Sequence, residues 1–174
     1  MTIAKILSSG YLSLGAVMIS KHIAIAIIEE GGEFFHGMTY SGDPTAWAVA
    51  KENIRILRDE KIVDQVKLYT GPYLQKNGTS LENHPLVGET RGIEFLGALE
   101  LVQIKRLRKR YDPSASAGTL CREAALDNEL IMQSVGDTVI ISLPLIINIE
   151  QIDELIELVG KSLDDAFRKL MNPK

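Results

Sequence analysis

Side chains that could carry chemistry are few in this sequence of 174 residues, and they lie far apart. No two of them have the spacing of metal ligands, and the sequence contains no His-x-x-x-His, Cys-x-x-Cys or Gly-x-Ser-x-Gly pattern. The sequence therefore gives little support to a metalloenzyme or a serine hydrolase. The candidate reactive residues are Lys5, Lys21, His22, His36, Asp43 and Cys121.

Lys5 differs from the other candidates in its surroundings. Ile3 and Ala4 precede it, and a turn of sequence SSGY follows at residues 8–11. A lysine at the apolar end of a strand is expected to be partly desolvated, which favours the neutral amine that attacks carbonyl groups. Lys5 is therefore a candidate nucleophile, although an ordinary structural lysine would fit the same residues.

Composition and charge indicate a globular domain without a polyanionic partner. Hydrophobic residues make up 45% of the chain, charged residues make up 24%, and the formal net charge is −4. One basic run, KRLRKR at Lys105–Arg110, contains no aromatic or glycine residue that could stack on bases. It therefore predicts an exposed, solvated surface rather than a nucleic-acid site.

Cysteine usage and the apolar runs favour a cytoplasmic protein. Cys121 is the single cysteine, so no internal disulfide can form, and it is expected to be a small buried hydrophobic residue. The longest clean apolar run, Ile23–Ile28, is too short to cross a membrane. The first twenty residues lack the continuous apolar region and cleavage site of a secretory signal, and they are predicted to be folded.

The first half of the chain alternates predicted strand and helix. Leu14–Ser20 predicts a buried strand, and Lys21–Glu30 predicts a helix that ends before two glycines. After the loop HGMTYSGDP, Asp43 can cap a helix that starts at Pro44. That helix is expected to reach about Asp59 and to bury an apolar stripe. The stripe consists of Trp47, Ala50, Ile54 and Leu57.

A second predicted helix begins near Ile62, with Val66 and Tyr69 on its buried side and a break or kink at residues 71–72. The turn-rich segment at 77–85 then gives the best internal boundary, which divides the chain into residues 1–76 and 77–174. Paired strands, a helix, a hairpin and a long capped helix are expected beyond it. The paired strands are Val87–Gly92 and Phe95–Val102, and the helix after them is Ala117–Asn128. The hairpin joins Leu130–Val135 to Thr138–Ser142, and the long capped helix runs from Asn148 through Leu170.

Several motifs, in this order, resemble the C-terminal part of class III pyridoxal-phosphate-dependent aminotransferases. They are AKILSSGYLSLGAVMIS, GGEFFHGMTYSGDP, HPLVGETRG, GALELV, GTLCRE, LIMQSVGDTVIIS and LPLII. The resemblance covers essentially the whole chain, and it is strongest to the branch of putrescine or polyamine:pyruvate and other ω-amino acid:pyruvate transaminases. It implies an α/β fold, the C-terminal portion of a fold-type I pyridoxal-phosphate-dependent transferase. Residues 1–76 would be a remnant of the cofactor-binding large domain, and residues 77–174 would be the small α+β C-terminal domain.

The resemblance also assigns site residues and partners. Lys5 falls at the family's Schiff-base lysine, which holds pyridoxal 5'-phosphate and later moves a proton at the substrate. Thr39 falls on the residue that binds the cofactor phosphate, in a loop whose Gly37 and Gly42 are expected to allow tight backbone geometry. In the family this Thr reaches the neighbouring subunit's cofactor, so a homodimer is implied. The substrates implied are an amine donor and a keto-acid acceptor such as pyruvate.

The sequence departs from the family pattern at four positions. The most consequential is Gln133, where many members carry an Arg that pairs with the substrate carboxylate. A neutral amide cannot form the bidentate, charge-assisted contact that Arg provides, so weak use of pyruvate is expected. The other three departures are Ile6 for Gly, Asp43 for His and Glu94 for Gly.

Length is the largest departure, because family members are well over twice as long. The cofactor contacts that lie upstream in the family have no counterpart in these 174 residues. We therefore expect a truncated C-terminal fragment of a transaminase that is very weak or inactive alone. The alternative is a catalytically inactive remnant, or a docking module for an intact aminotransferase subunit.

Overall fold

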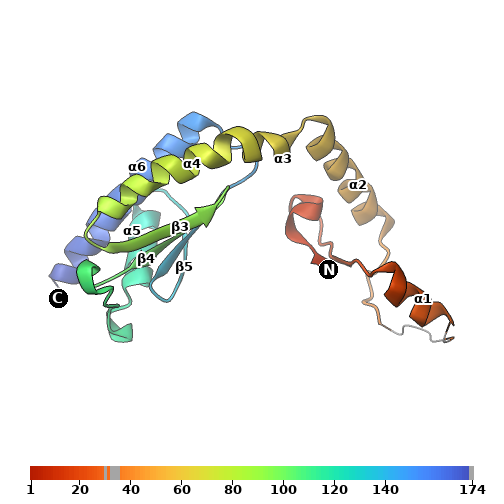
Figure 1. Ribbon diagram of the computed structural model, residues 1–174, viewed down its shortest axis with the longest axis horizontal. Helices are drawn as coiled ribbons and strands as arrows, with labels where there is room; N and C mark the ends of the chain where they lie inside the picture. Colours follow the sequence, from red (N-terminus) through yellow and green to blue (C-terminus); the bar gives the residue numbers. More distant parts are fainter. Residues whose placement is uncertain (30, 32–35, 173–174) are drawn as a thin grey trace. The chain divides into compact units, whose positions relative to one another are not determined.

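The computed structural model describes residues 1–29, 31 and 36–172. The chain divides into two compact units, Met1–Lys61 and Ile62–Lys174. The first contains a short ribbon and helices, and the second contains a four-stranded sheet with helices (Figure 1). The predicted boundary between residues 76 and 77 refers to the domains of longer family proteins, and it stays a prediction.

The first unit begins with a two-stranded antiparallel ribbon. β1 (Thr2–Ile3) pairs with β2 (Ala16–Val17), and the 3-10 helix η1 (Lys5–Ser8) lies between them in the sequence. The predicted buried strand over Leu14–Ser20 is wrong in length and in burial, because only two residues pair and Val17 is 69% exposed. So short a ribbon buries little apolar surface by itself, which leaves its side chains accessible.

The helices of the first unit lie where the sequence predicts them. α1 (Lys21–Glu29) matches the first predicted helix, and Glu30, its predicted last residue, lies outside the described residues. α2 (Pro44–Asp59) has the predicted bounds, and Asp43 caps it as predicted. No residue of α1 is buried, although most of its side chains are apolar.

The buried side of α2 differs from the predicted stripe. Ala50 is buried as predicted and Leu57 is half-buried, whereas Trp47 and Ile54 are 51% and 40% exposed. Ala46, which was not predicted, is buried as well. The helix packs on η1 through the side that carries these alanines and Asn53. Small side chains allow the backbone of η1 to approach α2 closely. The covered side of α2 therefore differs from the side on which Trp47 and Ile54 lie.

A continuous helical segment opens the second unit where the sequence predicted a break or kink. α3 (Ile62–Gln65), the π-helical turn η2 (Val66–Thr70) and α4 (Gly71–Gly78) follow one another directly. The Gly71 N–H donates to the Val66 carbonyl five residues earlier. This wider turn accommodates Pro72, which has no N–H and would crowd a carbonyl in a regular α-helix.

The wider turn also changes which side chains of this segment are buried. Val66 is 3% exposed, as predicted, but Tyr69 is 69% exposed, so its predicted burial is wrong. A π-helical turn holds more residues than an α-helical turn, which rotates Tyr69 away from the side that Val66 defines.

The second unit contains one antiparallel sheet of four strands in the order β3-β4-β6-β5. The strands are β3 (Val87–Ile93), β4 (Leu96–Leu101), β5 (Gln133–Val135) and β6 (Thr138–Ser142), which confirms the predicted strand pair and hairpin. A bulge interrupts the pairing of β3 with β4 between Val87 and Glu89. β3 and β5 form the two edges of the sheet.

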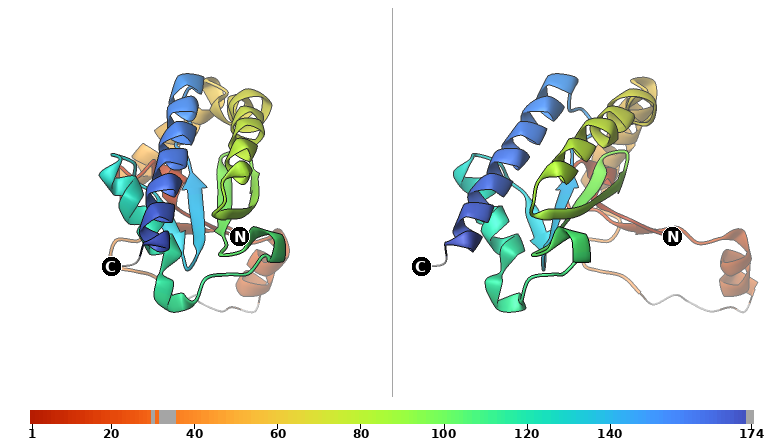
Figure 2. Two further views of the ribbon diagram at one scale, coloured as in Figure 1. Left: turned by 90° about the vertical axis from the view of Figure 1, so that its left-hand side faces the viewer. Right: turned by 60° about the vertical axis from the view of Figure 1, so that its left-hand side comes forward.

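Helices cover one face of this sheet (Figure 2). α5 (Ala117–Asp127) packs against α6 (Ile149–Met171), and both helices contribute to the main core with residues of β4 and β6. The predicted cap at the start of α6 is a capping box formed by Asn148 and Gln151. Fully buried members of the core include Val87, Cys121, Val139, Val159 and Leu163.

The start of α5 fits closely against the turn between β5 and β6. The Gly118 N–H donates to Asp137 Oδ1 over 3.1 Å, so an acid in the hairpin turn satisfies the first turn of the helix. A Cβ atom added at Gly118 would lie 2.0 Å from the Gly136 carbonyl oxygen. The turn predicted at Gly136–Asp137 therefore fixes the helix as well as the hairpin.

The basic run Lys105–Arg110 is exposed, as predicted. Three of its cations bind acidic or carbonyl groups on neighbouring segments, so part of its charge is neutralised locally. The partners are the Glu82 carbonyl for Lys105, Glu89 for Arg108 and Glu100 for Arg110. No helix in the described part of the chain is both long enough and apolar enough to span a membrane.

Glu94, which stands where the family pattern has Gly, lies at a position whose backbone favours glycine. It lies in the tight turn between β3 and β4 and has a φ angle of 51°, in the left-handed region that favours glycine. The Gln75 side-chain N–H group donates to the Glu94 carbonyl over 2.7 Å, which holds this turn against α4. The family's Gly suits the backbone here, and Glu94 therefore strains it.

We predict that Glu94→Gly raises the free energy of unfolding by about 0.5–1 kcal/mol, because the strain of a side chain in the left-handed region is removed. Urea unfolding followed by circular dichroism measures the change. Glu94→Ala removes the same charge but keeps a Cβ atom in the left-handed region, so it should not raise stability. Equal effects of the two substitutions would contradict the assignment of strain to Glu94.

Candidate functional site

Lys5 lies at the surface of the first unit. It is the first residue of η1, its side chain is exposed, and its φ angle is 60°. The predicted partial desolvation is wrong for this chain, because Lys5 starts a surface 3-10 helix rather than ending a buried strand. The amine is accessible to a ligand, and the left-handed backbone at a residue other than glycine is typical of positions under functional constraint.

Side-chain hydrogen bonds hold the segment that follows Lys5. Asn53 Nδ2 on α2 donates to the carbonyls of Ile6 and Leu7 over 2.7 and 3.2 Å, and Ser9 Oγ donates to Asn53 Oδ1 over 2.6 Å. The buried Ser8 hydroxyl donates to the Leu12 carbonyl over 2.6 Å. The backbone around Lys5 is thus fixed by polar contacts rather than by apolar packing.

Thr39 occupies the middle of a tight turn that precedes α2. The Ser41 N–H donates to the Met38 carbonyl, and the Met38 N–H donates to Ser41 Oγ, both over 2.9 Å. Thr39 is exposed at this turn, so its hydroxyl and N–H are accessible. These groups are the kind that bind a phosphate oxygen.

The two glycines beside this turn differ in their roles. Gly42 has a φ angle of 81°, so the predicted need for glycine is confirmed there. Gly37 lacks a positive φ, and among the described residues an added Cβ would meet only Ser41 Oγ at 3.7 Å, an ordinary contact distance. The predicted constraint at Gly37 is therefore wrong. Residues 32–35, which precede it in the resembling motif, lie outside the described residues.

Asp43 affects what the start of α2 can bind. Its Oδ1 accepts from the N–H groups of Thr45 and Ala46 over 2.7 and 3.2 Å. The bond from the Ala46 N–H, and to a smaller extent that from the Thr45 N–H, lowers the pKa of the Asp43 carboxyl below its usual range. The carboxyl is therefore ionised at neutral pH. The carboxylate thus uses N–H groups that could otherwise contact an anion, which leaves the turn around Thr39 as the candidate phosphate contact.

Gln133 belongs to the second unit, whereas Lys5 and Thr39 belong to the first. It is the first residue of β5, pairs with Ile140 of β6, and is exposed. It lines a cavity of about 340 Å³ together with Ile131, Ser142 and Leu155, and no residue that lines this cavity is ionisable. Within this cavity, therefore, no cation beside Gln133 takes the place of the Arg in the family pattern.

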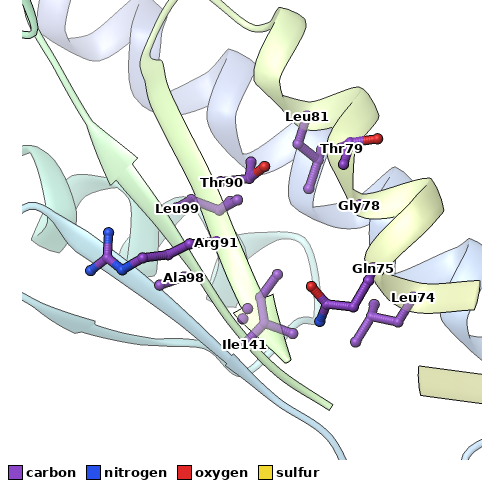
Figure 3. A pocket seen from close by; sticks show the side chains of 12 residues that line it. Leu74, Gln75, Gly78, Thr79, Leu81, Thr90, Arg91, Ala98, Leu99 and Ile141 are labelled. Atoms are coloured by element: carbon purple, nitrogen blue, oxygen red, sulfur yellow. The ribbon is translucent and has the colours of Figure 1, made fainter. Parts of the chain in front are cut away.

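A second cavity, of about 390 Å³, lies between α4 and the sheet (Figure 3). Leu74 of α4 and Leu81 of the 3-10 helix η3 (Thr79–Asn83) line it with Leu99 and Ile141 of the sheet. Arg91, its one ionisable residue, extends away from the side chains of α4 and pairs with Glu100 over 2.5 Å. The lining of this cavity is mixed, with Gln75, Thr79 and Thr90 beside the apolar residues, and it contains no carboxyl, imidazole, thiol or amine group.

The remaining candidates give no second reactive centre. Burial raises the pKa of the Cys121 thiol to about 12, so the thiol stays protonated, and the prediction of a buried hydrophobic residue is confirmed. Lys21, His22 and His36 are exposed. Among the described residues, no group of three or more His, Cys, Asp or Glu side chains is placed to hold a metal ion.

Sequence reasoning missed Asn53, which contacts the segment after Lys5. A polar residue seven positions after Ala46 and three after Ala50 lies on the covered side of α2. That placement would have marked it as a residue with hydrogen-bond partners. The predicted stripe of large apolar residues concealed it, because it placed the covered side elsewhere.

Solved structures of transaminases resemble this chain closely. A transaminase from the marine bacterium Virgibacillus superposes with a TM-score of 0.92 at 35% identity, over 98% of this chain and 40% of its own. An ω-transaminase from Thermomicrobium roseum superposes with a TM-score of 0.89 at 34% identity, over 95% and 37%. The predicted fold class, the C-terminal portion of a fold-type I transferase, is confirmed.

Sequence comparisons place the chain more narrowly. The family Aminotransferase class-III matches residues 1–163, and the chain belongs to this family of enzymes. The putrescine–pyruvate aminotransferase of Pseudomonas aeruginosa is 55% identical over 166 residues, which are 95% of this chain and 36% of that protein. Gamma aminobutyrate transaminase 1 of Solanum lycopersicum is 33% identical over 97% of this chain and 33% of that protein. The chain thus spans about a third of the length of these relatives.

We predict that the cap at Asp43 makes the first unit sensitive to acid. Because the folded pKa lies below the unfolded value, near 3.8, the cap stabilises α2 above that pH and is lost as the pH falls through the folded pKa. The difference in thermal midpoint between wild type and Asp43→Asn should therefore shrink between neutral pH and about pH 3. Asp59→Asn at the other end of α2 controls for the loss of one carboxylate, and a difference that does not change with pH would contradict the prediction.

Proposed function

We propose that this chain is the C-terminal part of a pyridoxal-phosphate-dependent transaminase that moves an amino group from an ω-amine or polyamine to a keto acid such as pyruvate. The observation that carries the proposal is the 55% identity to a putrescine–pyruvate aminotransferase over 95% of the chain. Residues 1–76 would belong to the cofactor-binding large domain, and residues 77–174 would form the small C-terminal domain.

The first unit offers two contacts that fit the cofactor. Lys5 has an exposed amine on a constrained backbone, and Thr39 has an exposed hydroxyl in a tight turn. The amine would bond to the aldehyde carbon of pyridoxal 5'-phosphate, and Thr39 would contact a phosphate. When bound, this cofactor supplies an electron sink for the negative charge that develops at the substrate Cα.

The roles of the chain's own groups follow from their chemistry. Lys5 Nζ, once a substrate amine has taken its place, would hold and move a proton at the substrate Cα. Gln133 would contact the substrate carboxylate through a neutral amide, which binds a carboxylate more weakly than a guanidinium does. The turn around Thr39 would serve the cofactor of a second copy, so the proposed assembly is a homodimer in the cytoplasm.

Catalysis is proposed for this chain together with the rest of the family fold. The chain spans 36% of the putrescine–pyruvate relative, and the upstream cofactor contacts of the family are not among its 174 residues. The chain alone would bond to the cofactor at Lys5 but transaminate very slowly.

The second candidate function is a docking module for an intact aminotransferase subunit, without catalysis. It is favoured by the apolar surface of the first unit, where α1 has no buried residue and Ile28 is 75% exposed. Trp47 is 51% exposed on α2. Burial of such a surface against another polypeptide would stabilise both.

We predict that pyridoxal phosphate modifies Lys5 selectively. Addition of the cofactor should give a new visible absorbance band, and borohydride reduction followed by peptide mass spectrometry should place the modification on Lys5. Lys5→Ala should abolish the band, whereas Lys21→Ala, which removes another exposed lysine of the same unit, should leave it. An equal distribution over surface lysines would favour the docking function.

We predict that Gln133→Arg strengthens keto-acid binding. A guanidinium adds a charge-assisted contact to the carboxylate, which should increase affinity for pyruvate about tenfold to a hundredfold, as calorimetry would measure. Val135→Arg places the same charge on the same face of β5 and should change affinity little. Ordinary pyruvate affinity in the wild-type chain would contradict the proposed weakness of this site.

A further inference from the structure

We propose that Asn53 is a positioning residue for Lys5, and this inference rests on the proposed function of Lys5. The Asn53 side chain on α2 forms hydrogen bonds with three residues that follow Lys5, namely Ile6, Leu7 and Ser9. Without it, the amine would remain in the chain but would lose its fixed direction.

Asn53 makes three hydrogen bonds across more than forty residues of sequence. Its Nδ2 donates to the carbonyls of Ile6 and Leu7 over 2.7 and 3.2 Å, and its Oδ1 accepts from Ser9 Oγ over 2.6 Å. The Ile6 carbonyl also accepts from the Ser9 N–H, so Asn53 adds a second donor to Ile6 and supplies one to the Leu7 carbonyl near the end of η1. One side chain thus contacts two carbonyls of η1 and the hydroxyl of the residue that follows it.

The backbone that Asn53 holds is strained. Lys5 and Ser9 have φ angles of 60° and 48°, so both ends of the segment lie in the left-handed region that residues other than glycine rarely adopt. Ala4, which precedes the segment, makes no side-chain cap for η1. Strained residues persist where neighbouring contacts determine their conformation. The bonds of Asn53 are the side-chain contacts that tie this segment to α2, beside the local bond of the Ser8 hydroxyl to the Leu12 carbonyl.

The chemistry of an amide is required at this position. Ile6 and Leu7 present carbonyl oxygens, which only accept, while the Ser9 hydroxyl donates. An amide offers a donor and an acceptor on one short side chain, whereas the carboxylate of aspartate would only accept and would repel both carbonyls. Asn53→Asp therefore preserves shape but reverses the interaction, and Asn53→Ala removes it.

The helix transmits this constraint toward the turn that carries Thr39. Asn53 follows Ala46 and Ala50 on one side of α2, and Asp43 joins the start of the same helix to that turn. The hydrogen bonds of Asn53 thus hold the segment after Lys5 against α2, the helix that follows the turn of Thr39. Both proposed cofactor contacts depend on one helix.

The test measures the reactivity of Lys5 relative to Lys21 within the same molecules. Wild type, Asn53→Ala, Asn53→Asp and Lys51→Ala are treated with limiting pyridoxal phosphate and then borohydride. The amine displaces the aldehyde oxygen as water, and hydride from borohydride converts the new C=N bond to a stable C–N bond. Peptide mass spectrometry gives the ratio of Lys5 to Lys21 modification. General unfolding would also lower this ratio, so the folded state of α2 is measured in the same variants.

Hydrogen exchange gives a readout that does not use the cofactor. In both Asn53 variants, the amides of residues 6–9 should exchange faster while those of residues 46–58 keep their protection, which shows that α2 remains folded. The Lys5 to Lys21 ratio should fall about tenfold, because two or three hydrogen bonds are lost. Lys51→Ala, an exposed neighbour on α2, should match wild type in both measurements.

The outcomes separate the two proposals. An unchanged ratio in both Asn53 variants, with Lys5 preferred in wild type, would overturn the positioning role and leave the function of Lys5 intact. A wild-type chain in which Lys5 is no more reactive than Lys21 would overturn the proposed function, and the positioning role with it. A lowered ratio with faster exchange confined to residues 6–9 supports both.

Discussion

Burial of one side of α6 against α5 and the sheet is the interaction on which the second unit depends. Val159 and Leu163 are fully buried among residues of β4, β6 and α5. The first unit has no comparable core in its described part, where the buried residues are Ser8, Ala46 and Ala50. Polar contacts such as those of Asn53 therefore carry a larger share of the stability of the unit that presents Lys5.

Local rules predicted the elements well, because the signals lie within a few residues of each other. The acid before Pro44, the capping pair at the start of α6 and the turn at Gly136–Asp137 act through adjacent backbone groups. Burial was predicted less well. Which side of α2 is covered depends on η1, a segment distant in sequence, and apolar side chains such as Trp47 misled because they remain exposed.

For the candidate site too, residue types were easier to predict from the sequence than the surroundings of each residue. Lys5, Thr39 and Gln133 were recognisable from motifs, since a motif records residue type and order. Their settings were not recognisable: Lys5 is at the surface, Asp43 uses the N–H groups at the start of α2, and Gln133 lies in the other unit. Asn53 was missed because no spacing rule links a helix side chain to carbonyls more than forty residues away.

The edges of the sheet in the second unit have a consequence for self-association. An unpaired strand edge can recruit another chain, and proteins prevent this with bulges, charges or short strands. β3 has a bulge beside Glu89 and also carries Arg91, while β5 has only three residues. Extension of this sheet from one copy to another is therefore disfavoured at both of its edges.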